Sequence, residues 1–196
     1  MKPYSDACEQ NKEPILDVLR ETFAAQTKIL EIGGGTGQHA VYFGQHLPHL
    51  IWQTSDLPEN LPGIQLWLDE VGLSNVLSPL ALNVASAHWP ITDADGIFSA
   101  NAVHIMSWVC VEKMFAGIGR MLQPGGIVCL YGPFNYGGKF TSSSNARFDD
   151  WLKRRDPDSG VRNFEDVDSL ARAQGLQLLK DYPMPVNNRT LVWKRE

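Results

Sequence analysis

The stretch EIGGGTG at residues 31–37 combines a carboxylate with closely spaced glycines, a combination that could bind a small ligand. Gly33, Gly35 and Gly37 allow positive φ angles and a close approach of a ligand to the backbone. A helix that begins here would add free N–H groups and the positive end of its dipole. Gln38 stands where a G-x-G-x-x-G dinucleotide fingerprint needs its third glycine, and no Lys-Ser/Thr follows as in a nucleotide P-loop. The spacing therefore disfavours a dinucleotide and a nucleoside triphosphate.

Three acidic or amide side chains near this loop indicate a nucleoside that carries positive charge and no phosphate. Glu31 beside a pyrophosphate would repel it by about 4 kcal/mol at ~4 Å and an effective dielectric constant of ~20. S-adenosylmethionine, with its ammonium and sulfonium groups, suits this carboxylate. Asp56, which follows the next apolar run, is expected to bind the ribose hydroxyls, and Asn83 the adenine edge. Leu57 and Val84 would hold the adenine ring between them. Each of the three polar residues could instead serve only a local ion pair or turn.

A second group of candidate residues lies in segment 99–108. His104 is the histidine placed best to act as a base, because an imidazole pKa of ~6.5 suits proton removal at neutral pH. It could equally be a hydrogen-bonded structural histidine. Asn101 is expected to contact the cofactor's amino group through its backbone carbonyl. Trp108 is a candidate substrate wall, with a place in the core as the alternative.

Further polar and aromatic residues predict a substrate site around the same edge. Segment 133–145, with Gly137-Gly138 and a serine run, is a candidate mobile lid. Asn11 and Lys12 could neutralise the cofactor's carboxylate if the N-terminal segment folds over it. The candidate substrate residues are Tyr4, Asn11, Lys12, Trp108, Asn135, Tyr136, Asn187 and Asn188. Such side chains suit a small polar substrate that could include an aromatic ring.

Alternating strand and helix patterns supply the elements that must position these residues. Strands are predicted at 28–32, 50–55, 76–82, 96–100, 127–132, 176–182 and 189–195, the last two as an antiparallel pair. Helices are predicted from Pro14, around 40–47, 64–71, 111–122 and 148–152, and from a cap at Asn163 to Gly175. Pro79 favours an edge position for its strand. This alternation indicates a doubly wound α/β fold whose ligands bind at the carboxyl ends of the strands.

Several motifs together resemble the class I S-adenosylmethionine-dependent methyltransferases. The glycine stretch is similar to their first motif, Asp56 matches their ribose-binding acid, and LQPGG at 122–126 resembles their turn before the fifth strand. Asn83 departs from the pattern, because the superfamily more often has an aspartate there. The resemblance implies a Rossmann-like seven-stranded sheet of order 3-2-1-4-5-7-6 with strand 7 antiparallel.

A closer resemblance extends over nearly the whole chain. ACEQNKEPIL, GTGQHAVYF, NAVHIMSW, YGPFNYGGKFTSSSNARFD and MPVNN resemble an uncharacterised methyltransferase-like family of bacteria and animals, known as a domain of unknown function. This implies a single domain over residues 1–196, with an N-terminal cover helix within 1–25. It implies no substrate, so the acceptor class stays open.

Composition and charge narrow the remaining classes of function and ligand. The chain has 196 residues and a net charge of −5, which disfavours nucleic-acid binding. Three cysteines without CxxC spacing and histidines without ligand spacing predict no metal site, and a reducing cytoplasm fits best. No apolar run indicates a membrane segment or a signal peptide. The leading hypothesis is a small-molecule methyltransferase. The alternatives are a non-catalytic S-adenosylmethionine-binding protein, acting as a sensor or a partner subunit, and an NAD-dependent oxidoreductase.

Overall fold

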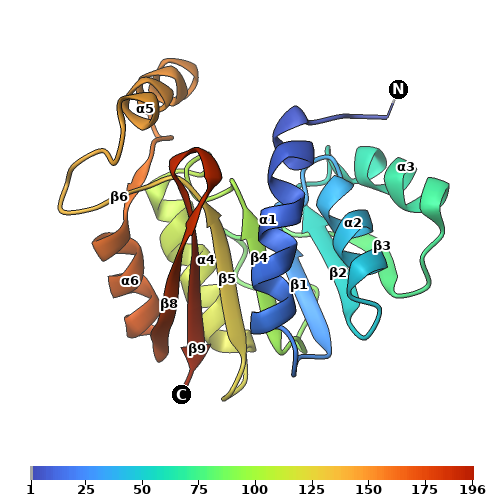
Figure 1. Ribbon diagram of the computed structural model, residues 1–196. Helices are drawn as coiled ribbons and strands as arrows, with labels where there is room; N and C mark the ends of the chain where they lie inside the picture. Colours follow the sequence, from blue (N-terminus) through green and yellow to red (C-terminus); the bar gives the residue numbers. More distant parts are fainter. Residues whose placement is uncertain (1) are drawn as a thin grey trace.

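The computed structural model describes residues 2–196 and has a seven-stranded sheet at its centre (Figure 1). The strands are β1 (Lys28–Ile32), β2 (Ile51–Asp56), β3 (Val76–Ala81), β4 (Gly96–Ala100), β5 (Ile127–Gly132), β8 (Leu176–Met184) and β9 (Asn188–Arg195). Their order is β3-β2-β1-β4-β5-β9-β8, and β9 runs antiparallel to both of its neighbours. This confirms the predicted order, because β8 and β9 are the sixth and seventh strands of the sheet. Pro79 lies in β3 at the sheet edge, as predicted.

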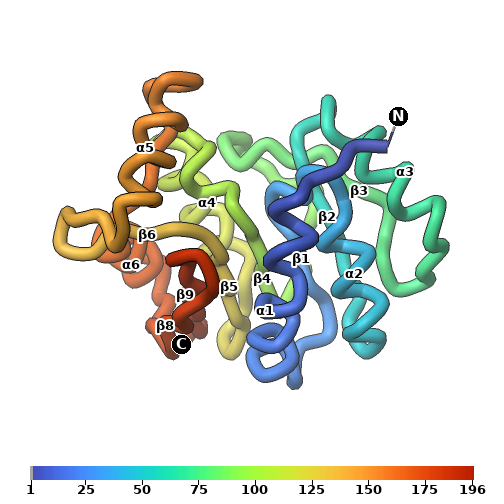
Figure 2. The backbone as a smooth tube through the Cα atoms, turned by 45° about the horizontal axis from the view of Figure 1, so that its top comes forward, coloured from blue at the N-terminus to red at the C-terminus, as the bar shows by residue number. Residues whose placement is uncertain are grey.

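Helices cover both faces of the sheet (Figure 1). They are α1 (Asp6–Thr22), α2 (Gln38–His46), α3 (Leu61–Val71), α4 (Trp108–Met121), α5 (Ser143–Arg155) and α6 (Phe164–Ala173), with a short 3-10 turn, η1 (Pro185–Asn187). The first three helices pack in one apolar cluster on one face, whereas α4 and α6 belong to the cluster on the other. In Figure 2, α5 stands away from both layers, above the edge where β5 ends.

Large buried side chains fix both layers. Phe43 of α2, Trp52 of β2 and Phe98 of β4 meet on one face, with ring centroids 5.3–5.6 Å apart. Phe115 of α4 and Trp193 of β9 meet edge to face on the other, 6.3 Å apart. Burying each such side chain contributes about 1.5–3 kcal/mol, so the strands form a rigid support. Because β1, β2, β4 and β5 are parallel, their carboxyl ends meet at one edge.

The N-terminal helix is longer than the sequence pattern predicts. It begins at Asp6 rather than at Pro14, which lies inside it. Ser5 caps the helix by accepting the Cys8 N–H at 3.4 Å, and acidic side chains in the first turn favour the positive dipole end. An internal proline costs the bond to the carbonyl four residues earlier, that of Gln10. The helix nevertheless continues through Pro14 and packs against α2.

Segment 133–145 contains more regular structure than a free lid would. Phe134–Asn135 forms the short strand β6, which pairs in parallel with β7 (Arg162–Asn163). Tyr136 and Lys139 exchange two backbone hydrogen bonds of 3.0 and 3.1 Å. The Gly137 N–H donates to Glu165 Oε1 at 2.9 Å. The turn is therefore tied to the body of the molecule at both ends.

Candidate functional site

A cavity of about 1050 Å³ opens at the carboxyl edge of the sheet. The ends of β1, β2, β4 and β5 form its floor, and α1, α5 and the β8–β9 turn contribute its walls. Ten predicted site residues line it: Asn11, Gly33, Gly35, Asp56, Leu57, Asn83, Val84, Asn101, His104 and Asn188. The fold thus brings together at one cavity residues that lie far apart in the sequence. We call the part beside residues 33–37 the glycine-loop end and the part beside α5 the α5 end.

The glycine loop is held in place by strand β2. The N–H groups of Gly33 and Gly34 donate to the Ser55 carbonyl at 3.0 and 2.9 Å. Gly33, Gly35 and Gly37 have φ angles of 76°, 58° and 91°, a region that glycine adopts without steric cost. A Cβ on Gly34 would lie 2.3 Å from Thr54 Oγ1, so this position has no room for a side chain. The loop backbone is therefore exposed to the cavity in one fixed shape.

Asp56 connects the glycine loop to the end of β2. Its Oδ2 accepts the Gly35 N–H at 2.7 Å. Its Oδ1 accepts the Leu57 N–H at 2.7 Å and the Asn60 side-chain amide at 2.8 Å. An ionised carboxylate offers about four acceptor positions, so one is left for a ligand hydroxyl. Asp56 therefore orders the loop as well as facing the cavity.

Glu31 lies outside the cavity lining, beneath the glycine loop. Its Oε2 accepts the Trp52 indole N–H at 3.0 Å, and a Cβ on Gly34 would be 3.4 Å from the same oxygen. Burial raises the pKa of this carboxyl to about 7, against the opposing effect of the Trp52 hydrogen bond. The sequence predicted direct contact with a cationic ligand, whereas the structure places Glu31 one layer below the loop.

Three residues complete the wall of the glycine-loop end. Asn83 follows β3, and its Oδ1 accepts the Ala85 N–H at 2.9 Å, which leaves the amide N–H groups free to donate. Val84 is buried and Leu57 is partly exposed, and both line the cavity. They offer the apolar surfaces and the donor that a flat heterocycle requires.

Asn101 and His104 meet where β4 and β5 end. Asn101 has a φ of 57°, a left-handed conformation that asparagine tolerates, and donates its N–H to the Tyr131 carbonyl at 2.8 Å. Both side chains lie against Gly132: a Cβ there would be 3.4 Å from His104 Nδ1 and 3.7 Å from Asn101 Oδ1. Backbone strain of this kind is typical of functional sites.

His104 is only 4% exposed, yet its imidazole makes no hydrogen bond within residues 2–196. Burial lowers the pKa of His104 to about 4, with a smaller contribution from the charge of the Arg162 guanidinium. The ring is therefore neutral at pH 7, with one nitrogen able to accept a proton or a hydrogen bond. The Phe148 ring of α5 meets it edge to face at 5.2 Å.

Several predicted residues lie away from the main cavity. Tyr4 stacks on Trp67 at 6.5 Å, and Lys12 pairs with Glu9 and lies 4.9 Å from the Tyr42 ring centre. Gly37 packs against α3, where a Cβ would meet the backbone of Ile64 at 3.0 Å. None of Tyr4, Lys12 and Gly37 lines the cavity.

Four further predictions also fall outside the lining. Trp108 packs against the core, which was the alternative considered for it. Asn135 donates its amide to the Val161 carbonyl at 3.3 Å. Tyr136 and Asn187 line a separate cavity of about 630 Å³, where the Tyr136 hydroxyl donates to Asp181 at 2.7 Å. These positions do not fit direct contact with a ligand in the main cavity.

The sequence interpretation missed the residues by which α1 closes over the glycine loop. Gln38 binds the Ser5 N–H at 2.6 Å and donates to Glu9 at 2.8 Å, so it ties α1 to α2. His39 Nε2 is 2.7 Å from Asn11 Oδ1, and burial lowers its pKa to about 4. The sequence signal for these residues was Gln38-His39-Ala40, because they directly follow the last glycine and begin the helix after a ligand-binding loop.

It also missed one side of α5. Phe148, Trp151 and Arg155 line the cavity at helical spacing, i, i+3 and i+7. The Trp151 ring stacks on Phe148 at 5.8 Å and 16°, and the Arg155 guanidinium carbon is 4.6 Å from the Trp151 ring centre. Lys153, Arg154 and Arg155 form the basic last turn of α5, and of these three Arg155 reaches the cavity.

Comparison with known proteins identifies the family. A family model described as "Protein of unknown function (DUF938)" matches residues 2–195. The chain belongs to this family. Among the described residues of this DUF938 member, no helix is long and apolar enough to cross a membrane. Nor do these residues contain a group of three or more His, Cys, Asp or Glu side chains that could hold a metal ion.

Solved structures similar to this DUF938 member share the class I methyltransferase fold. An O-methyltransferase family protein from Burkholderia thailandensis has a TM-score of 0.85 at 18% identity, covering 97% of this chain and 58% of its own. An O-methyltransferase family 2 protein from Planctomyces limnophilus, solved with apigenin, has a TM-score of 0.82 at 16% identity and the same coverages.

The O-methyltransferase NcsB1 of neocarzinostatin biosynthesis was solved with S-adenosylmethionine and 2-hydroxy-5-methyl naphthoic acid. It has a TM-score of 0.78 at 15% identity, covering 97% of this chain and 55% of its own. The chain thus spans a little over half the length of these structures. At such identities the likeness shows the fold.

Proposed function

We propose that this protein is an S-adenosylmethionine-dependent methyltransferase that acts on a small molecule. The observation that carries the proposal is one cavity with two different ends. The glycine loop and Asp56 form one end, and the buried imidazole of His104, which makes no hydrogen bond within the described residues, faces the other. The fold shared with solved methyltransferases supports the same proposal.

The charges of the lining fit this cofactor better than a phosphate-bearing one. Asp56 and Arg155 are the two charged side chains among the lining residues, and Arg155 belongs to α5 at the opposite end. No lysine or arginine lines the cavity beside the glycine loop to neutralise a phosphate. A bound phosphate would instead face the carboxylate of Asp56, an unfavourable contact of several kcal/mol at about 4 Å.

Residues of the glycine-loop end would hold the cofactor. Asp56 would accept from a ribose hydroxyl with its remaining acceptor position, and Asn83 would donate to the adenine edge between Leu57 and Val84. The polar groups of Ser5, Gln10 and Asn11 on α1 face the same space and suit the cofactor's carboxylate. Asn101 supplies a backbone carbonyl for its ammonium group.

When bound, the sulfonium supplies an electrophilic methyl carbon, whose bond to sulfur breaks as the acceptor atom bonds to it, so that S-adenosylhomocysteine remains. The chain's own part is to position the acceptor and exclude water. His104 accepts a hydrogen bond from an acceptor hydroxyl, because its ring is neutral at pH 7. Through this bond it aligns the oxygen lone pair, and it takes up the hydroxyl proton only as the bond to the methyl carbon forms, because burial makes it a weaker base than a free imidazole.

Isothermal titration calorimetry with S-adenosylhomocysteine and with NADH tests the cofactor directly. Binding of S-adenosylhomocysteine without binding of NADH is expected, and the reverse result would replace the proposal by an oxidoreductase. A screen of metabolite extracts with methyl-labelled S-adenosylmethionine then tests transfer. Cofactor binding with no labelled product under any condition would favour the non-catalytic binding protein.

A further inference from the structure

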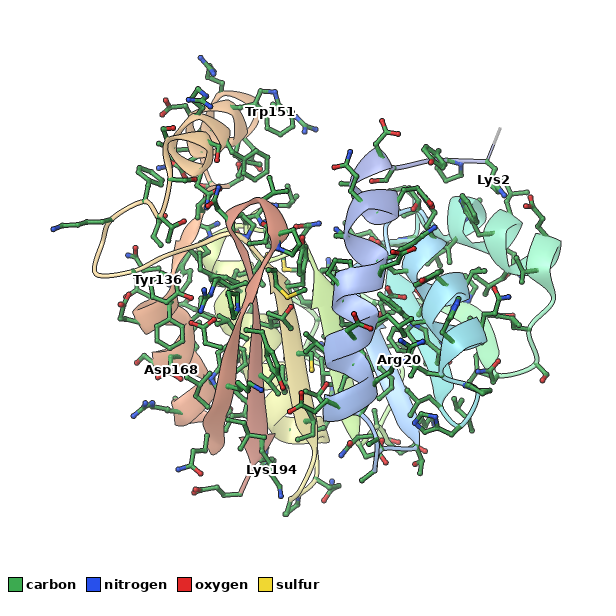
Figure 3. The ribbon with its side chains drawn as sticks, in the orientation of Figure 1. Lys2, Arg20, Tyr136, Trp151, Asp168 and Lys194 are labelled. Atoms are coloured by element: carbon green, nitrogen blue, oxygen red, sulfur yellow. The ribbon has the colours of Figure 1, made fainter. Side chains whose placement is uncertain are left out.

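The α5 end of the cavity carries a column of planar side chains. His104, Phe148 and Trp151 follow one another with ring centroids 5.2 and 5.8 Å apart, and Arg155 follows 4.6 Å beyond Trp151. All four line the cavity. His104, at one end of the column, is only 4% exposed, whereas Trp151 is 44% exposed. Figure 3 shows Trp151 on the side of α5 that faces the N-terminal helix.

Three of the four members leave hydrogen-bonding groups or apolar surface without a partner within the described residues. The imidazole of His104 has no hydrogen bond in the part of the chain that the structure describes. The guanidinium of Arg155 forms no ion pair there, whereas Lys153 in the same turn pairs with Asp149 at 2.6 Å. Trp151 exposes a large apolar ring at the cavity instead of packing it in the core.

Two further apolar side chains of the cavity lining are exposed. Ile105 and Val186 line the cavity with 50% and 75% of their surfaces exposed. Val186 has a φ of 58°, a left-handed conformation that a β-branched residue adopts at a cost of about 1–2 kcal/mol. A flat apolar ligand in the cavity that covered these side chains and the α5 rings would remove both surfaces from water.

The geometry points to an aromatic carboxylic acid as the methyl acceptor, with the reacting hydroxyl on the side of the ring away from the acid. The ring would stack along Phe148 and Trp151, the carboxylate would bind Arg155, and the hydroxyl would reach His104. This inference rests on the proposed function, since it names the acceptor of the same reaction.

The test compares three probes by ligand-observed NMR, with and without saturating S-adenosylhomocysteine. The probes are 4-hydroxycinnamate, its neutral amide, and 2-hydroxybenzoate, whose hydroxyl and acid are too close together to reach both ends of the column. We expect 4-hydroxycinnamate to bind at least tenfold more tightly than the other two and to be methylated on its hydroxyl when S-adenosylmethionine is supplied. Equal binding of acid and amide would overturn the acid class.

Two variants locate the acid. Arg155→Ala is expected to weaken 4-hydroxycinnamate about tenfold and to leave the amide unchanged. Arg154→Ala, one residue away in the same exposed turn, is the matched control and should change neither. If Arg155→Ala weakens S-adenosylhomocysteine instead, the guanidinium serves the cofactor's carboxylate and the inference is wrong. Failure of S-adenosylhomocysteine to bind the wild type would refute the proposed function separately.

Discussion

The two ends of the cavity differ in how far their polar groups are already satisfied. At the glycine-loop end, Asp56 accepts three hydrogen bonds and Glu31 accepts one from Trp52. At the α5 end, His104 and Arg155 make no side-chain hydrogen bond or ion pair within residues 2–196. The first end is therefore built in advance for one ligand, whereas the second end gains its missing partners only from a ligand. Such a division suits an invariant cofactor and a separate acceptor.

His104→Ala should have the largest effect, because it removes the proposed base at the α5 end of the cavity. Loss of a general base typically lowers turnover about 10²–10⁴-fold, and we expect a decrease in that range with cofactor affinity unchanged. Initial rates with the best acceptor and calorimetry with S-adenosylhomocysteine measure the two quantities. His88→Ala, at an exposed histidine, is the control. Unchanged turnover in the His104 variant would make this histidine structural.

Glu31→Gln tests whether the buried carboxyl beneath the glycine loop destabilises the fold when it is charged. The pKa of Glu31 is raised from 4.5 to about 7, so the folded state holds its proton where the unfolded state has lost it. The contribution of Glu31 to the unfolding free energy is fully present below pH 4.5 and is lost as the pH rises to about 7. The variant should therefore gain up to about 3 kcal/mol of unfolding free energy relative to the wild type over this range.

Urea unfolding at several pH values measures that difference. Exposed Glu59→Gln is the control, and its difference from the wild type should stay constant with pH. A pH-independent difference for Glu31→Gln would mean that the carboxyl is not held protonated beneath the loop. His39 and His104 act in the opposite sense, because their lowered pKa values make the fold less stable as the pH falls from 6.5 to 4.

Asp56→Asn should weaken S-adenosylhomocysteine by about 1.5–3 kcal/mol, the range for hydrogen bonds that involve a charged group. The variant keeps the size of the side chain but loses the acceptor that orders Gly35 and faces the cavity. Calorimetry measures the affinity, and Asp69→Asn on the exposed side of α3 is the control. Wild-type affinity in a folded Asp56 variant would show that the carboxylate does not contribute to this end.

Val186→Asn should have the smallest effect. It tests whether the backbone at the α5 end of the cavity is strained. Asparagine tolerates the left-handed conformation of this residue, so the unfolding free energy should rise by about 1 kcal/mol. Thermal unfolding measures the gain. Val109→Asn, at an exposed helical valine, should give none. A loss of stability at position 186 would mean that the valine contact outweighs the backbone strain.

The sequence predicts the glycine-loop end far better than the α5 end. The glycine loop, Asp56 and Asn83 each lie at the end of a strand or just after it, so the parallel order brings them together by topology alone. The structure places Glu31 one layer below the loop, because the spacing of residues does not fix the face of the sheet to which a strand side chain points. The column on α5 depends on the angle at which a helix crosses the cavity, and no local pattern encodes that angle.

The N-terminal helix illustrates a second kind of limit. Its polar first turns lack an apolar stripe, so periodicity places the start at Pro14, eight residues late. What orders that part of α1 is a set of long-range hydrogen bonds, from Ser5 and Glu9 to Gln38. Contacts between residues about thirty positions apart leave no trace in a local window. For the same reason the sequence does not reveal that Tyr4 packs on Trp67 and that Lys12 pairs with Glu9.

The reversed direction of β9 has a practical consequence for measurements on immobilised protein. Because β9 runs antiparallel to β5, the chain ends at the edge of the sheet opposite the cavity, whereas α1 begins beside it (Figure 1). An affinity tag or surface anchor attached after Glu196 would leave the mouth of the cavity open to solution. Biosensor and pull-down experiments should therefore anchor the protein by its last residue.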